Sequence, residues 1–405
     1  MNIVSSTGRW VLGFICGLLA FQSLAQDLPP TTVLFENVRI FNGIDSDLSD
    51  PAHVLVEGNL ITRISASPIP VTRRADTRII QGDGRILMPG LIDAHWHMAM
   101  AAVPMPVLLT ADIGYLNLVA SRTARDTLMR GFTSVRDLSG PTFGLKRAID
   151  EGLAEGPRIW PSGAMISQSG GHGDFRMIYE VPAARNAPLS RGEVLNGGVI
   201  ADGADEVLKR AREQLMLGAT QIKLAAGGGV SSHYDPLDVS QYTEREFRAA
   251  VEAAENWGTY VAVHAYTPRA IQTAIAAGVK SIEHGQLMDE PTAKLMAQHD
   301  VWLSIQAFLD NEFANPQSGA NRVKQLQVSA GTDTAVALAK KYKLKVAWGS
   351  DILFNPTMVV HQGGILASMT RWYTPAEVLI MATSANAELL AMSGPRNPYP
   401  GKLGV

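Results

Sequence analysis

"LMPGLIDAHWHMAM", residues 87–100, ends an apolar run with two histidines one residue apart. In a β-strand the side chains i and i+2 share a face, so His95 and His97 project together while Trp96 points toward a helix layer. An isolated histidine pair of this kind is more often a hydrogen-bonded pair than a metal site. The stretch therefore gains a functional meaning only if the rest of the chain supplies partners for the two imidazoles.

From Gly90 onward, short apolar runs alternate with amphipathic stretches. The change in hydrophobic period from two to about 3.6 is typical of repeated βα units. The strand candidates are residues 91–98, 132–138, 158–165, 220–227, 259–266, 280–285, 301–308 and 344–352, and helix-like stretches include 206–218, 243–258, 267–278, 289–300 and 374–394. Eight such strands predict an α/β fold with a closed (β/α)8 TIM-like barrel. A doubly wound open sheet is the alternative, but it normally has a glycine-rich phosphate turn after its first strand, and "IDAHWH" is not one.

The region before the barrel has a different sequence pattern. Residues 31–87 alternate short β-branched runs with the turn signals "EGN" and "GDG", which predicts a small antiparallel β unit of the sandwich type. We therefore expect the β unit at 26–87 and the barrel at 88–394. Residues 395–405 would begin a return to the β unit and stop there, so either the sequence is truncated or the β unit is incomplete. An incomplete sheet has an exposed edge, which predicts reduced solubility or a homo-oligomer that covers this edge.

The first 25 residues have the pattern of a signal peptide. Arg9 precedes the apolar core "WVLGFICGLLAF", and Ser23 and Ala25 occupy the small-residue positions of a cleavage site. The core is short for a membrane span, although an uncleaved anchor is the alternative. We expect a periplasmic or secreted protein that leaves the membrane after signal removal. The only cysteine, Cys16, lies inside this segment, so the exported chain would have no disulfide and no cysteine nucleophile.

Composition excludes one class of partner. The formal net charge is −3 and no basic stripe occurs, so we expect no nucleic-acid ligand. The absence of a G-x-S-x-G segment argues against a serine hydrolase of the α/β-hydrolase type.

Polar residues occur near the carboxyl ends of several predicted strands, which is where barrel enzymes build their active sites. Each of these residues by itself could have an ordinary structural role, such as a capping aspartate or a solvent-facing lysine. Together they would bring an ammonium, a carboxylate and several imidazoles to one mouth, and an unpaired buried charge is costly. Divalent metal removes that cost, and imidazole with carboxylate suits Zn²⁺. The set is His95, His97, Lys223, His264, His284 and Asp351. A lysine ammonium repels a cation, so Lys223 fits only if its charge is inverted.

The motifs "PGLIDAHWH", "SGGHGD", "QIKLAAGGG", "VAVHAY", "SIEHG" and "WGSD" occur in this order between residues 89 and 351. In order and content the chain resembles the amidohydrolase superfamily, most closely its secreted prolidase-like and ochratoxinase-like amidases, a branch related to imidazolonepropionase. The resemblance covers nearly all of the chain from about Thr32. It implies two divalent metal ions, with Zn²⁺ favoured, and a CO₂-derived carbamate on Lys223 that bridges them. It also implies that His95, His97 and Asp351 hold one metal and that His264 and His284 hold the other.

The resemblance implies a binuclear metal-dependent amidohydrolase that cleaves the amide of dipeptides or N-acyl amino acids, including Xaa-Pro and ochratoxin A type substrates, by a metal-bridging hydroxide. Asp351 would be the catalytic proton shuttle. His172 and Tyr234 are the candidate substrate-binding residues, whereas Arg136 and His233 are expected to be structural. Two alternatives stay open: a cyclic amide hydrolase or deaminase of the imidazolonepropionase type, and a non-catalytic secreted barrel that binds metal or a ligand.

Overall fold

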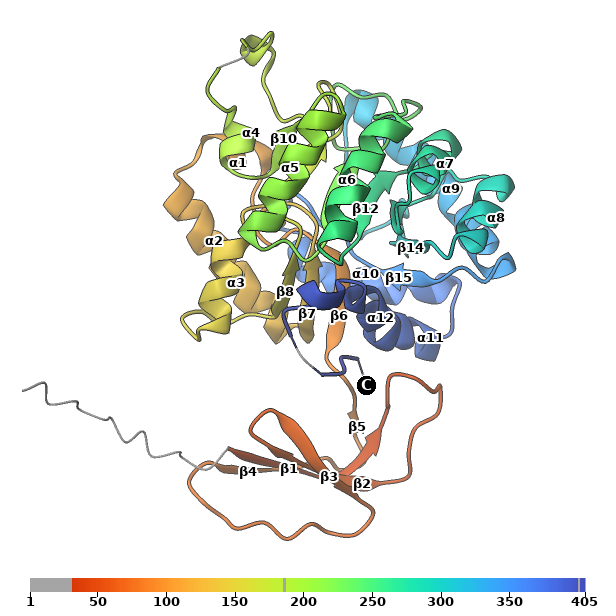
Figure 1. Ribbon diagram of the computed structural model, residues 1–405. Helices are drawn as coiled ribbons and strands as arrows, with labels where there is room; N and C mark the ends of the chain where they lie inside the picture. The colour runs from red at the N-terminus through yellow and green to blue at the C-terminus, as the bar shows by residue number, and fades with distance from the viewer. Residues whose placement is uncertain (1–30, 185–186, 400, 405) are drawn as a thin grey trace, which may run out of the picture. The chain divides into compact units, whose positions relative to one another are not determined.

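The computed structural model describes residues 31–184, 187–399 and 401–404 (Figure 1). The predicted signal peptide lies outside these residues. The described residues form two compact units: residues 31–38 and 51–84 make up one, and residues 39–50 together with the described residues from 85 onward make up the other. Within the described part of the chain, no helix is both long and apolar enough to cross a membrane.

The smaller unit is a β-sheet. Its strands are β1 (Thr32–Ile40), β2 (Ala52–Glu57), β3 (Leu60–Ser65) and β4 (Thr77–Gln81), in the order β3-β2-β1-β4. Gly58, at a φ of 63°, forms the tight turn between β2 and β3, so the hairpin predicted from "EGN" is confirmed. The expectation of a wholly antiparallel unit is wrong, because β4 pairs with β1 in parallel, as does β5 (Ile86–Leu87). A long connection, residues 66–76, replaces the tight turn that an antiparallel neighbour would need.

The larger unit is the predicted barrel. All eight strand candidates form strands: β6 (Leu91–Trp96), β7 (Phe132–Asp137), β8 (Arg158–Pro161), β11 (Ile222–Ala225), β12 (Val261–Ala265), β13 (Ser281–His284), β14 (Trp302–Ile305) and β15 (Val346–Trp348). The third strand candidate, residues 158–165, forms two strands instead of one, because Gly163 at a φ of 70° separates β8 from β9 (Met165–Ser167). β10 (Gly198–Ile200) pairs with β9. Every pairing from β6 to β8 and from β10 to β15 is parallel. The barrel closes where the Asp351 amide donates to the His95 carbonyl, at 2.9 Å.

The helices lie outside the strands (Figure 1). They are α1 (Met105–Thr110), α2 (Ile113–Met129), α3 (Phe143–Asp150), α4 (Arg191–Val194), α5 (Ala204–Leu217), α6 (Glu244–Asn256), α7 (Pro268–Ala276), α8 (Glu290–Gln298), α9 (Gly319–Lys341), α10 (Gln362–Ser368), α11 (Pro375–Ile380) and α12 (Asn386–Ala391), with a π-helical turn at Met381–Ala385. Their ends follow ordinary capping chemistry. Thr243 and Glu246 form a reciprocal capping box at the start of α6, and Gly218 ends α5 in the left-handed region. The helices predicted at 206–218, 243–258, 267–278, 289–300 and 374–394 are confirmed.

Candidate metal centre and substrate pocket

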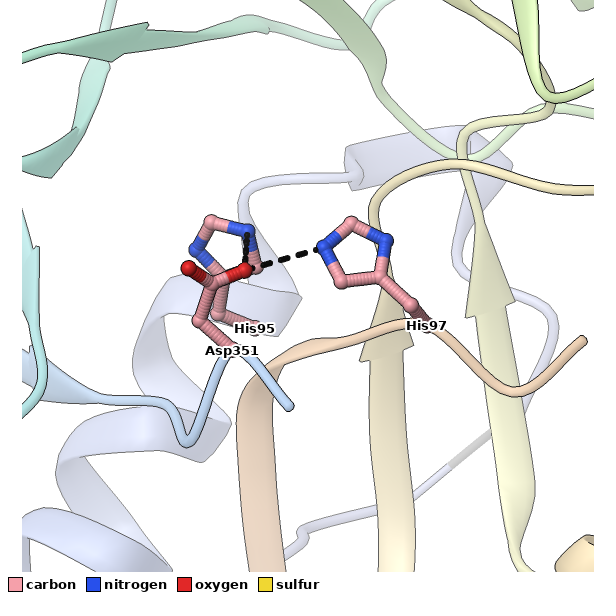
Figure 2. A group of neighbouring side chains, drawn as sticks. All are labelled: His95, His97 and Asp351. Carbon is pink, nitrogen blue, oxygen red and sulfur yellow. Dashed lines mark hydrogen bonds and ion pairs between the residues drawn. The ribbon is translucent and has the colours of Figure 1, made fainter. Parts of the chain in front are cut away.

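Three of the predicted metal ligands converge at the barrel mouth. The donor atoms of His95, His97 and Asp351 all lie within 4.8 Å of one another (Figure 2). The Asp351 Oδ1 atom lies 3.3 Å from His95 Nε2 and 3.1 Å from His97 Nε2. β6 presents His95 and the residue directly after its end presents His97, while the loop after β15 brings the carboxylate to them from more than 250 residues away.

A glycine lets these two strand ends approach. A Cβ atom on Gly349 would lie 2.3 Å from the Cβ of His95, so any other residue would push β15 away from β6. Asp351 itself has a φ of 53°, and His284 has a φ of 86°. Non-glycine residues held in the left-handed region store strain and gather at functional sites. The surrounding barrel therefore holds the backbone at Asp351 and His284 in a strained conformation, and this conformation directs both side chains into the site.

The other predicted ligands lie beside this group. The His284 ring is centred 5.0 Å from the His95 ring and 4.5 Å from the His264 ring. Lys223 is 2% exposed and lines the same pocket. The structure thus brings all six residues of the predicted metal set to one site.

The protonation states fit a metal-binding donor set. Burial lowers the pKa of His95 to about 3 and that of His284 to about 4, and it lowers the pKa of His264 well below its ordinary value. Burial by itself would raise the pKa of Asp351, but the neighbouring imidazoles lower it overall. Neutral imidazole nitrogens beside an ionised carboxylate are the ligands that Zn²⁺ prefers. Burial also lowers the pKa of Lys223 to about 8, which favours its neutral amine relative to an exposed lysine.

The hydrogen-bond partners indicate which ring nitrogen two of the histidines, His95 and His264, present to the site. His95 Nδ1 lies 3.1 Å from Glu283 Oε2, so the Nδ1–H donates to this carboxylate and the Nε2 lone pair faces Asp351. His264 Nε2 lies 3.1 Å from the Gly228 carbonyl, which leaves Nδ1 as its lone-pair atom. His97 Nδ1 is buried and has no hydrogen-bond partner among the described residues. These residues fit a metal centre by their chemistry and by their orientation.

Buried polar residues that sequence reasoning missed support the first histidine. Asp93 accepts hydrogen bonds from the His95 and Ser350 amides, both at 3.0 Å, and from Gln362. Glu283 is held by Arg136 through two contacts of 2.8 Å, and both side chains are 0% exposed. The structural role expected for Arg136 is therefore confirmed. Asp93 and Glu283 occur inside the quoted motifs "LIDAHWH" and "SIEHG", each within two residues of a predicted metal ligand, and this proximity was the available signal.

The predicted substrate-binding residues line one pocket of about 450 Å³ together with the metal set. The His172 ring stacks on the His264 ring at 4.0 Å, and its Nδ1 lies 2.8 Å from Ser232 Oγ. Tyr234 is 43% exposed, and its hydroxyl donates to the Arg176 carbonyl at 3.1 Å. His233 also lines the pocket and is exposed.

Much of the pocket wall is apolar, a feature that no sequence motif marked. We name its side chains on α1 and in the loop after β15 the apolar wall: Met105, Leu109, Leu353 and Phe354. Met105, Leu353 and Phe354 pack on a buried cluster that includes Met100 and Leu108. A substrate in this pocket would contact these hydrocarbon side chains as well as the candidate metal centre.

The barrel and its convergent histidine–aspartate group define a metal-dependent hydrolase. Residues 86–395 match the model of the amidohydrolase family. The chain belongs to this family and acts on carbon–nitrogen bonds.

Individual relatives agree. An ochratoxinase of Aspergillus niger is 32% identical over 357 residues, covering 78% of this chain and 68% of the relative. The crystal structure of an amidohydrolase superposes with a TM-score of 0.81 at 35% identity, covering 92% of this chain and 89% of the other. A prolidase crystallised with N-methylphosphonate-L-proline gives a TM-score of 0.80 at 32% identity, with coverage of 93% and 90%.

Proposed function

We propose that the protein hydrolyses the amide bond of N-acyl amino acids or dipeptides, with two divalent metal ions and a carbamate on Lys223. The convergence of His95, His97 and Asp351 in the pocket carries the proposal, because Lys223, His264 and His284 line the same space. The similarity to an ochratoxinase and to a prolidase supports an amide whose amine side is an amino acid.

In this proposal each side chain has a defined task. His95, His97 and Asp351 would hold one ion, His264 and His284 the other, and Lys223 both. When bound, such ions polarise a carbonyl and lower the pKa of water. Asp351, through its second carboxylate oxygen, Oδ2, would accept a proton from the attacking water and return it to the leaving nitrogen. His172 would donate to the substrate from its stacked position beside His264.

The proposal predicts hydrolysis that depends on metal and on bicarbonate. Protein stripped by a chelator is expected to lose turnover of acyl-proline, acyl-phenylalanine and dipeptide substrates, and Zn²⁺ with bicarbonate is expected to restore it. Amino acid release and metal content per chain are the measurements. Turnover of cyclic ureas or imidazolones without amide hydrolysis would favour the imidazolonepropionase type, and full metal binding without any turnover would favour the non-catalytic barrel.

The apolar wall predicts a preference for large hydrophobic substituents. Burial of one methylene contributes about 0.8 kcal/mol, so kcat/KM is expected to rise about two- to fourfold per added methylene until the wall is covered. A series of acyl-prolines from acetyl to octanoyl measures this. Leu109→Gln places an amide on the wall and is expected to flatten the series, whereas Leu118→Gln, at a 73% exposed position on α2, serves as the matched control. A flat series in the unmodified protein would contradict the preference but leave the proposed reaction intact.

A further inference from the structure

The loop after β11 leaves the barrel at residue 226, contributes to the pocket, and returns to the same place at residue 241. The Gln241 amide donates to the Ala226 carbonyl at 2.8 Å, and Gly227 pairs with Ser240, so the two ends of the loop are fixed side by side. Between them, Ser231, Ser232, His233 and Tyr234 line the pocket. We name residues 229–235 the loop tip.

A single ammonium from a distant helix binds the backbone of the loop tip. Lys324 on α9 donates to the carbonyls of Gly229, Ser232 and Asp235 at 3.1, 3.0 and 2.9 Å. An ammonium has three N–H donors, so these three carbonyls saturate it. Val328, one turn further along α9, packs in an apolar cluster with Val230 and Leu237. Positions i and i+4 share a helix face, so Lys324 and Val328 contact the loop from the same side of α9.

The loop tip in turn holds His172. Ser232 Oγ lies 2.8 Å from His172 Nδ1, and Asp235 Oδ2 lies 3.5 Å from the same atom. Asp235 also accepts from the Gly229 amide at 2.7 Å. A Cβ atom on Gly229 would lie 1.9 Å from the His172 ring, so the loop backbone packs directly on this imidazole. The His172 ring also stacks on the His264 ring, with their centroids 4.0 Å apart.

We propose that Lys324 is a positioning residue, which sets the loop tip and through it the His172 ring beside the candidate metal centre. This inference depends on the proposed function only for the expected effect on substrate turnover; the contact between Lys324 and the loop tip does not depend on it. Without the ammonium three half-buried carbonyls lose their common donor, and the tip is free to separate from α9. The part of the pocket formed by Ser231–Tyr234 would then become more mobile, and so would the His172 ring. We therefore expect weaker substrate binding, seen as a higher KM.

The sequence offers a clean chemical test, because Cys16 is the only cysteine. In a full-length Cys16→Ser background, Lys324→Cys is expected to raise KM for amide substrates about tenfold or more with a smaller change in kcat, because all three hydrogen bonds from the charged group are lost. Alkylation with 2-bromoethylamine, in which the thiolate displaces bromide, rebuilds an ammonium of nearly the same reach and should restore KM. Alkylation with iodoacetamide gives a neutral side chain and should not.

Hydrogen exchange of the loop-tip amides supplies a readout that needs no turnover. Exchange is expected to quicken in Lys324→Cys and to slow again only after aminoethylation. Lys341→Met is the matched control, since this lysine lies on the same helix in an exposed pair with Glu290. Unchanged KM and unchanged exchange in Lys324→Cys, or equal rescue by both reagents, would overturn the proposal. An enzyme inactive on every amide would contradict the proposed function, while the exchange data would still decide the role of Lys324.

Discussion

Replacing Asp351 with asparagine is expected to lower kcat/KM for amide hydrolysis by about a thousandfold or more. The substitution keeps the shape of the side chain but removes its charge and its basicity. Proton transfer by a positioned side chain contributes about 10²–10⁴ in rate, and the loss of an anionic metal ligand adds to this. Because the Oδ1 atom contacts both His95 and His97, the neutral amide also weakens the group that gathers these imidazoles.

The control for this variant is Asp112→Asn. Asp112 caps α2, where its carboxylate accepts a hydrogen bond from the Tyr115 amide at 3.2 Å. Asparagine caps a helix about as well as aspartate, so activity and stability should both stay unchanged. Steady-state kinetics and metal content are measured for both variants. Asp351→Asn with full metal content and more than a tenth of the original activity would contradict the shuttle role.

The barrel could be predicted from the sequence because its signals are local. Each strand candidate is a short apolar run, and each predicted helix has its own period and terminal signal, as Gly218 and Thr243 show. The metal set was also accessible, since a residue near the carboxyl end of a barrel strand faces the mouth whatever the loops do. The parallel pairing of β4 with β1 was missed because strand direction depends on a long connection rather than on composition.

The supporting residues depend on distances that no local pattern contains. Lys324 is an ordinary lysine on α9, and its three acceptors lie about 90 residues earlier in the chain. The apolar wall joins α1 to the loop after β15, two segments about 245 residues apart by their numbering. Arg136 and Glu283 come from β7 and β13, which are not neighbours in the barrel. Only the closed barrel brings such pairs together across its interior.

The second large effect is expected at this buried pair: Arg136→Met should lower the free energy of unfolding by about 3–5 kcal/mol. Arg136 also donates to the Ala94 carbonyl and to Tyr260 and Ser281. Methionine fills similar space but leaves the Glu283 carboxylate buried without its cation. Thermal or urea unfolding measures the loss, and Arg147→Met, in an exposed helical pair with Glu151, should change little.

The double variant Arg136→Met/Glu283→Gln separates the charge from the shape. A neutral glutamine no longer needs a counter-ion, so at least half of the lost stability should return, whereas an unchanged loss would mean that packing rather than charge set the cost. The activity of the double variant should not recover together with its stability. The glutamine oxygen accepts from His95 Nδ1 more weakly than the carboxylate does, which makes Nε2 a poorer metal ligand, and metal affinity should stay about 10–100-fold below that of the original protein. The ion pair beneath the pocket would then matter more for orienting His95 than for holding the barrel together.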